Sequence, residues 1–103
     1  MIPKKIKALL DSLLKSTENE ELKWYYNDDE SFVSLETSNF KLSIHYKFNY
    51  DQEIGTFRVE YVNLDKYKIY YFHTDQTNKD YELVSALYDV AQSSDLDLNL
   101  NNI

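Results

Sequence analysis

The sequence has no cysteine, and only one glycine and one proline among its 103 residues. Without cysteine there can be no disulfide, no thiol nucleophile and no thiolate metal ligand, which is compatible with a reducing compartment. A single glycine excludes a glycine-rich phosphate-binding loop. Most turns are therefore expected to rely on Asn, Asp and Ser, whose short polar side chains stabilise tight bends.

Long hydrophobic runs are also missing. No apolar stretch approaches the ~20 residues that a membrane-spanning helix needs. Three lysines near the start, Lys4, Lys5 and Lys7, are followed by an amphipathic pattern instead of the solid apolar segment of a secretory signal. We therefore expect a cytoplasmic protein without a membrane partner. The length suits one domain, residues 1–103, and 43% hydrophobic and 16% aromatic residues can supply its core.

Charge is unevenly distributed along the chain. The formal net charge is −7, from 11 basic and 18 acidic residues. Residues 1–15 are basic, whereas residues 16–37 and 75–103 are strongly acidic. An acidic balance disfavours binding to a phosphate backbone. It suits a basic protein partner, or simply contributes to solubility.

The clearest structural signal is the segment from Phe40 to Tyr50. Every even position is apolar or aromatic and every odd position is polar over these eleven residues. This period of two predicts a β-strand with one buried face and one solvated face. One-sided burial is typical of an antiparallel sheet, because parallel sheets are usually covered on both faces.

The other elements follow from shorter patterns. Residues 3–16 have the apolar spacing of an amphipathic helix, and further strands are expected at residues 22–27, 31–37, 56–62 and 66–73. Adjacent Phe32 and Val33 leave open which way the 31–37 strand faces. A second helix should begin with Thr77 as its N-cap and end near Ser93. The alternating tail, residues 94–103, is expected to fray; an edge strand is the alternative.

Together these elements predict an α+β fold. It is a two-layer sandwich in which an antiparallel meander of four or five strands carries the N- and C-terminal helices on one face. The leucine-rich first helix, the Leu22-Lys23-Trp24 segment, the meander and a closing helix with Leu87-Tyr88 resemble small uncharacterised bacterial αββββα domains. That resemblance implies the fold but no established activity, and it transfers no functional residue.

Catalytic and metal-binding patterns are weak. Ser43 and His45 would share a strand face, but no oxyanion donor is in view. His73 and Asp75 could supply two metal ligands, and a third would have to come from elsewhere. The acidic run 28–30 lies in a turn, where carboxylates are usually solvated. We therefore expect a protein that is not an enzyme and that uses no cofactor or metal.

The sheet face away from the helices is the remaining candidate for function. If the even residues of 40–50 face the helices, the odd ones lie on the open face. The open face is then expected to carry Tyr70 and Phe72 as exposed aromatic residues, joined by Tyr25, together with four cations against one anion, Glu60. The candidate partner-binding residues are Tyr70, Phe72, Tyr25, Lys41, His45, Lys47, Arg58 and Lys68.

Two functions follow from such a face. The first is a small acidic, non-enzymatic interaction module that binds a protein partner or itself; by analogy alone, immunity proteins, antitoxins and DNA mimics are comparable. The alternative is binding of single-stranded nucleic acid, because aromatic side chains on a basic sheet can stack on bases.

Overall fold

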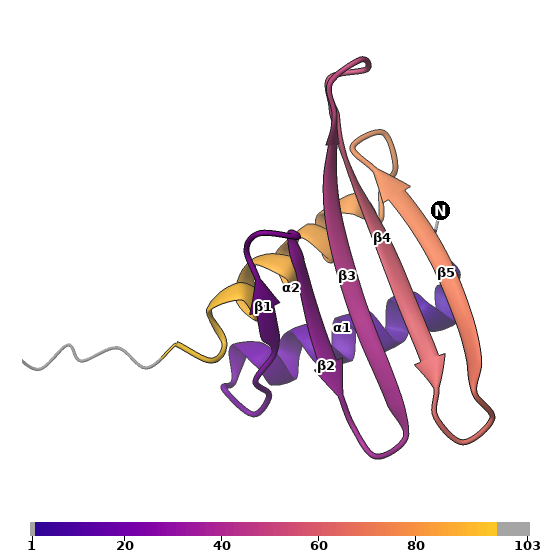
Figure 1. Ribbon diagram of the computed structural model, residues 1–103, viewed down its shortest axis with the longest axis vertical. Coiled ribbons are helices and arrows are strands. Elements are labelled where there is room, and N and C mark those ends of the chain that lie inside the picture. Colours follow the sequence, from indigo (N-terminus) through magenta and orange to yellow (C-terminus); the bar gives the residue numbers. More distant parts are fainter. Residues whose placement is uncertain (1, 97–103) are drawn as a thin grey trace, which may run out of the picture.

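The computed structural model describes residues 2–96 of the chain. It confirms the α+β class (Figure 1). The five strands form one antiparallel sheet in the order β1-β2-β3-β4-β5, so each strand pairs with its neighbours in sequence. In chain order the elements are α1 (Lys4–Glu18), β1 (Tyr25–Asn27), β2 (Phe32–Glu36), β3 (Phe40–Asn49), β4 (Ile54–Asn63), β5 (Lys68–Asp75) and α2 (Tyr81–Ser93).

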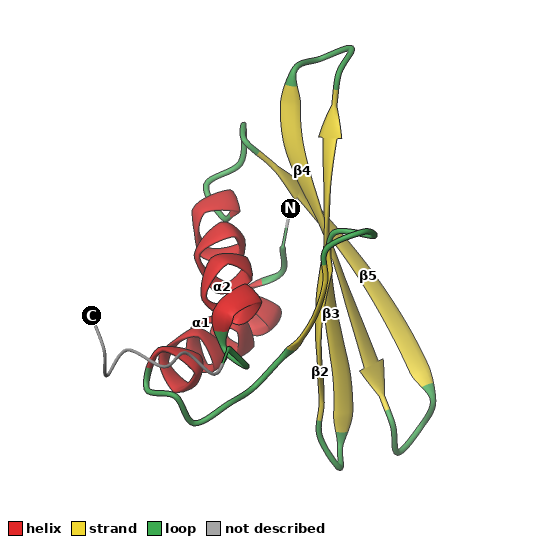
Figure 2. Cartoon of the chain, turned by 60° about the vertical axis from the view of Figure 1, so that its left-hand side comes forward, coloured by secondary structure: helices red, strands yellow, loops and turns green. Residues whose placement is uncertain are grey.

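Both helices lie on the same side of the sheet (Figure 2). No element of residues 2–96 covers the other side, which we call the uncovered face. The alternation of β3 explains this arrangement. Leu42 and Ile44 are fully buried beneath the helices, while Lys41 and Lys47 are exposed on the opposite side. The core between the layers combines these residues with Leu10 of α1 and with further apolar side chains, including Val59, Val84 and Leu87.

Strand pairing settles the facing of β2. Val33 is opposite Ile44 and Leu35 is opposite Leu42, and both are buried. Directly opposed residues of an antiparallel pair share a face. Phe32, opposite His45, therefore lies on the uncovered side.

Three of the hairpin loops are built alike. Asn27, Asn49 and Asn63 each end a strand, and each side-chain oxygen accepts a backbone N–H from within the following loop at 2.9–3.2 Å. Four residues beyond each asparagine, Ser31, Glu53 and Tyr67 adopt positive φ angles of 54–55°. The residue after that pairs with the asparagine. Each loop therefore turns the chain in four residues without glycine.

The one glycine serves packing instead of a turn. Gly55 has no positive φ angle, but a Cβ atom placed on it would lie 2.7 Å from the Tyr46 hydroxyl and 3.0 Å from that of Tyr81. The backbone of β4 thus makes room for two tyrosines from β3 and α2.

Asp80 fastens the start of the chain to the segment that enters α2. Its buried carboxylate accepts the Ile2 backbone N–H at 2.6 Å and a short hydrogen bond from the Thr74 hydroxyl. Thr77, expected as the N-cap, instead donates its hydroxyl and its backbone N–H to Asp75. The N-cap position belongs to Asp80, and its side chain makes no capping hydrogen bond. The Thr77 prediction was wrong because Asp75 ends β5 and holds Thr77 in a turn.

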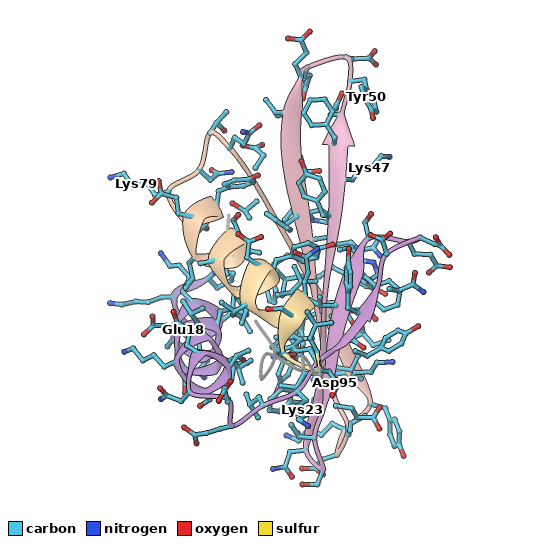
Figure 3. The ribbon with its side chains drawn as sticks, turned by 90° about the vertical axis from the view of Figure 1, so that its left-hand side faces the viewer. Glu18, Lys23, Lys47, Tyr50, Lys79 and Asp95 are labelled. Carbon is cyan, nitrogen blue, oxygen red and sulfur yellow. The ribbon has the colours of Figure 1, made fainter. Side chains whose placement is uncertain are left out.

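Trp24 ties the other end of the helical layer to the sheet. Its indole N–H donates to the Thr17 hydroxyl at 3.0 Å, and its backbone N–H donates to the Ser94 hydroxyl at 2.7 Å. Lys23 and Asp95 lie close by (Figure 3), with 3.9 Å between the Lys23 Nζ and Asp95 Oδ1 atoms. Ser94 and Leu96 continue α2 as a turn, and the rest of the predicted frayed tail, 97–103, lies outside the described residues. Neither helix in residues 2–96 is long and apolar enough to cross a membrane.

Replacing Asp80 with Asn should destabilise the protein in a pH-dependent way. Burial opposes the charged form, but the hydrogen bonds from Thr74 and Ile2, together with the charge of Lys7, outweigh it and lower the pKa of Asp80. A carboxylate with a lowered pKa stabilises the fold above its ordinary pKa, and this stabilisation is lost as the pH falls through the folded value. We expect Asp80→Asn to cost about 1–3 kcal/mol at pH 7, and less below about pH 4.

Urea denaturation followed by the fluorescence of Trp24, the one tryptophan, measures this loss. Asp65→Asn, an exposed aspartate in the β4–β5 loop, is the matched control and should be neutral. Equal midpoints for Asp80→Asn and the unaltered protein at pH 7 would contradict the role given to Asp80.

The loop geometry makes a second prediction. A residue other than glycine in the left-handed conformation destabilises the fold by roughly 1–2 kcal/mol. Replacing it with glycine removes this strain, but glycine loses more backbone entropy on folding, which costs about 0.5–1 kcal/mol. Glu53→Gly should therefore be neutral or stabilising by about 0.5 kcal/mol. Gln52→Gly, one residue earlier and without a positive φ, should destabilise. The same urea titration compares the two variants, and the reverse order would contradict this account of the loop.

Candidate functional site

The structure divides the predicted site residues between the two faces of the sheet. Tyr25, Lys41, His45, Lys47 and Arg58 lie on the uncovered face, as the pairs Lys41–Val62 and His45–Arg58 show. Tyr70, Phe72 and Lys68 do not join them. They follow the helix-facing pattern of β4, because they pair with Tyr61, Val59 and Asn63.

Placing Tyr70 and Phe72 on the uncovered face was therefore wrong. β5 is apolar at both odd and even positions, so its own pattern could not orient it. The four-residue loop orients it by pairing Asn63 with Lys68, which turns the even residues of β5 toward the helices. On the uncovered face β5 instead carries Ile69 and Tyr71, which are 51% and 54% exposed.

The uncovered face has aromatic groups at the β1 side. The ring centroids of Tyr25 and Phe32 are 5.9 Å apart, and those of Phe32 and His45 are 5.0 Å apart. Arg58 and His73 continue the His45 row across β4 and β5. Phe32 was not among the predicted site residues, because its neighbour Val33 obscured the facing of the strand.

The charges on this face are balanced, contrary to the sequence interpretation. The strand positions that face outward carry three cations, Lys41, Lys47 and Arg58, against three anions, Glu36, Glu60 and Asp75. Lys68 belongs to the other face. The expected excess of cations is thus absent from the described strands. Binding of single-stranded nucleic acid stays a prediction, and this balance does not favour it.

A shallow hollow of about 380 Å³ lies over the middle of this face. Its lining includes His45, Arg58, His73 and Lys47, with Glu30 from the β1–β2 loop. Partial burial lowers the pKa of His45, the charge of Arg58 lowers it further, and Glu60 and Glu30 oppose this weakly. His45 is therefore neutral near pH 7, which makes the hollow less basic than its composition suggests.

Two of the arrangements considered for chemistry are not found among the described residues. Ser43 is buried and makes no hydrogen bond with His45, although the two share a face. Between Ile2 and Leu96, no three His, Asp or Glu side chains come together as metal ligands.

A second hollow, of about 530 Å³, is more apolar and lies on the helix side. It opens between the first turns of α1 and the β4–β5 pair. Figure 2 shows the start of β5 diverging from the helices. Tyr70 is 44% exposed here, and Phe72 packs partly against the core. We call this the α1–β5 groove; its lining residues are Pro3, Lys5, Ile6, Leu9, Tyr61, Asn63, Tyr70 and Phe72.

β5 therefore presents apolar side chains on both of its faces. Ile69 and Tyr71 lie on the uncovered side, and Tyr70 and Phe72 border the α1–β5 groove. Within residues 2–96, β5 pairs with β4 and with no other strand, so its second edge is open. Natural edge strands are usually short or protected by charge. β5 has eight residues, with its Lys and Asp at the ends.

Comparison with known proteins adds no relative. The chain matches no family model, no curated protein and no solved structure. The resemblance to αββββα domains is thus supported only as an element order, which here has five strands between the two helices.

The electrostatics of the hollow around His45, on the uncovered face, can be tested by NMR titration of the His45 ring. We expect its pKa to lie below the usual value of about 6.5. Arg58→Gln should raise it only part of the way, because burial is the larger cause. Lys41→Gln, farther along β3, is the control. A pKa at or above the usual value in the unaltered protein would contradict this description.

Proposed function

We propose that this protein is a small non-enzymatic interaction module that associates through the open edge of β5. The partner that its chemistry fits best is a second copy of the same chain, paired antiparallel along β5. The observation that carries the proposal is the eight-residue edge strand with apolar side chains on both faces.

The open edge of β5 can form backbone hydrogen bonds with another strand. An edge strand presents unpaired N–H and C=O groups along its length, and another strand can satisfy them. At the opposite edge of the sheet, β1 has only three residues. β5 is thus the longer of the two edges for a strand to join.

The distribution of charge along the chain also favours association through β5. The β4–β5 hairpin, residues 54–75, contains three bases (Arg58, Lys66, Lys68) and three acids (Glu60, Asp65, Asp75), so it is neutral with His uncharged. The rest of the chain carries the whole net charge of −7. Two copies that meet along β5 would bring together their least repulsive surfaces.

Antiparallel self-pairing also matches the ends of the strand. It would set Lys68 at the start of β5, and Lys66 in the loop before it, near the acidic end of β5 in the second copy, where Asp75 lies. A twofold axis perpendicular to the sheet keeps the two inner faces on one side. When that axis passes through Tyr71, the two Tyr71 side chains meet on the uncovered face, and Tyr70 meets Phe72 of the second copy on the other.

Measuring molar mass by light scattering over a range of concentrations tests this proposal. We expect the unaltered protein to show twice the mass of one chain at high concentration. Ile69→Lys combined with Tyr71→Lys should shift it to a monomer, because lysines on an edge strand oppose pairing. A double variant at exposed α1 positions, Ala8→Lys with Ser12→Lys, makes the same change in charge and should leave the dimer intact.

A single-chain mass at every concentration would overturn the pairing of two copies. Equal weakening by both double variants would show that charge alone acts, and would overturn the role of the β5 edge.

A further inference from the structure

A third hollow lies between α2 and the helix-facing side of the sheet, away from β5. It has a volume of about 380 Å³. Four of its lining residues are tyrosines from three different elements, so their phenol groups converge from α2, β1 and β3. We call this hollow the tyrosine pocket; its lining residues are Tyr26, Ser31, Tyr46, Phe57, Tyr81, Ser85, Tyr88, Asp89 and Gln92.

The walls of the tyrosine pocket are aromatic rings in contact. Phe57 lies at the base, 2% exposed, with ring centroids 5.3 Å from those of both Tyr81 and Tyr88. Tyr46 packs on the same group, 5.1 Å from Phe57 and 6.3 Å from Tyr88. This packing, and the Gly55 backbone that admits Tyr46 and Tyr81, fixes the rings in place before any ligand arrives.

The hydroxyl group of Tyr88 faces the tyrosine pocket without a hydrogen-bond partner among the described residues. Tyr88 is only 7% exposed, yet its hydroxyl forms no hydrogen bond with another residue in the range 2–96. No fully buried side-chain oxygen among those residues lacks a partner, so the Tyr88 hydroxyl must reach the surface of the pocket. A nearly buried polar group that opens onto a hollow is available to a ligand. Tyr26, in contrast, already donates to Asp28 at 2.6 Å.

The pocket is also electronegative. Burial, with the nearby Tyr26, Asp28 and Asp89, raises the pKa of Tyr88 to about 12. Burial, Tyr46 and Asp89 raise that of Tyr81 as well. The lining contains no Lys, Arg or His. At neutral pH the tyrosines are uncharged, and the carboxylates of Asp28 and Asp89 leave a negative potential without a local counter-charge.

We propose that the tyrosine pocket binds the guanidinium group of an arginine side chain from a partner protein. Guanidinium is planar and stacks on aromatic rings, and its N–H groups can donate to the Tyr88 hydroxyl and to the Asp89 carboxylate. A carboxylate or phosphate would meet like charge here. This site shares no residue with the β5 edge, so it stands or falls independently of the pairing of two copies.

NMR titration of amide shifts with the amide of N-acetyl-arginine, a model for an arginine side chain in a peptide, tests the proposal. We expect saturable shifts of the backbone amides of Ser31, Ser85 and Asp89, with millimolar affinity. N-acetyl-citrulline amide has the same shape without the charge and should give no saturable shifts. The same response to both probes would overturn the proposal, and so would the absence of a saturable response to the arginine probe.

Two variants locate the binding. Tyr88→Phe keeps the ring and should weaken arginine binding about tenfold, the effect of a lost hydrogen bond to a charged group. Asp89→Asn, at an exposed position on α2, should weaken it about threefold to fivefold, as for a partly solvated ion pair. Asp65→Asn makes the same charge change in the β4–β5 loop and should have no effect. Unaltered affinity in both pocket variants would place the binding elsewhere and refute the site.

Discussion

One constraint organises this molecule: the apolar side chains of β3 all point to one side, so both helices must pack on that side. Leu42 and Ile44 are fully buried there and are opposed by Val33, Leu35, Tyr61 and Val59 of the neighbouring strands. The other face is left to water because no third layer exists in the part of the chain that the structure describes (Figure 2). The surfaces considered for function are what this packing leaves exposed, at the edge of the sheet and beside the helices.

Where one face of an element was polar, the sequence predicted the fold well. The β3 alternation, the amphipathic α1 and the closing helix all appear where expected, with bounds that differ by a few residues. Such patterns are reliable because each records which side of the element meets water. The same reasoning failed at β5, where Ile69 and Tyr71 on one side compete with Tyr70 and Phe72 on the other.

The length of the β4–β5 loop orients β5, and a loop sequence that occurs three times in the chain indicates this length. Residues 27–31, 49–53 and 63–67 all begin with Asn and have Asp at the third position. All three close a four-residue turn with a hydrogen bond from the N–H three residues later to the asparagine side-chain oxygen, and all three end in a left-handed residue. Had this repeat been identified, the register of β5 and the facing of Phe32 would both have followed. The tyrosine pocket could not have been predicted, because it depends on how α2 lies against the sheet.

The first and last parts of the chain hold each other in place. Ile2 is hydrogen-bonded to Asp80, and Trp24 to Ser94, over sequence separations of 78 and 70 residues. α1 packs on α2, and all five strands lie between these two helices in sequence, so Leu10 and Leu13 are fully covered only when α2 has packed against α1. Contacts between such distant positions form late because the loop they close is long. During folding, the apolar face of α1 therefore stays partly exposed to water until α2 packs beside it and completes the helical layer.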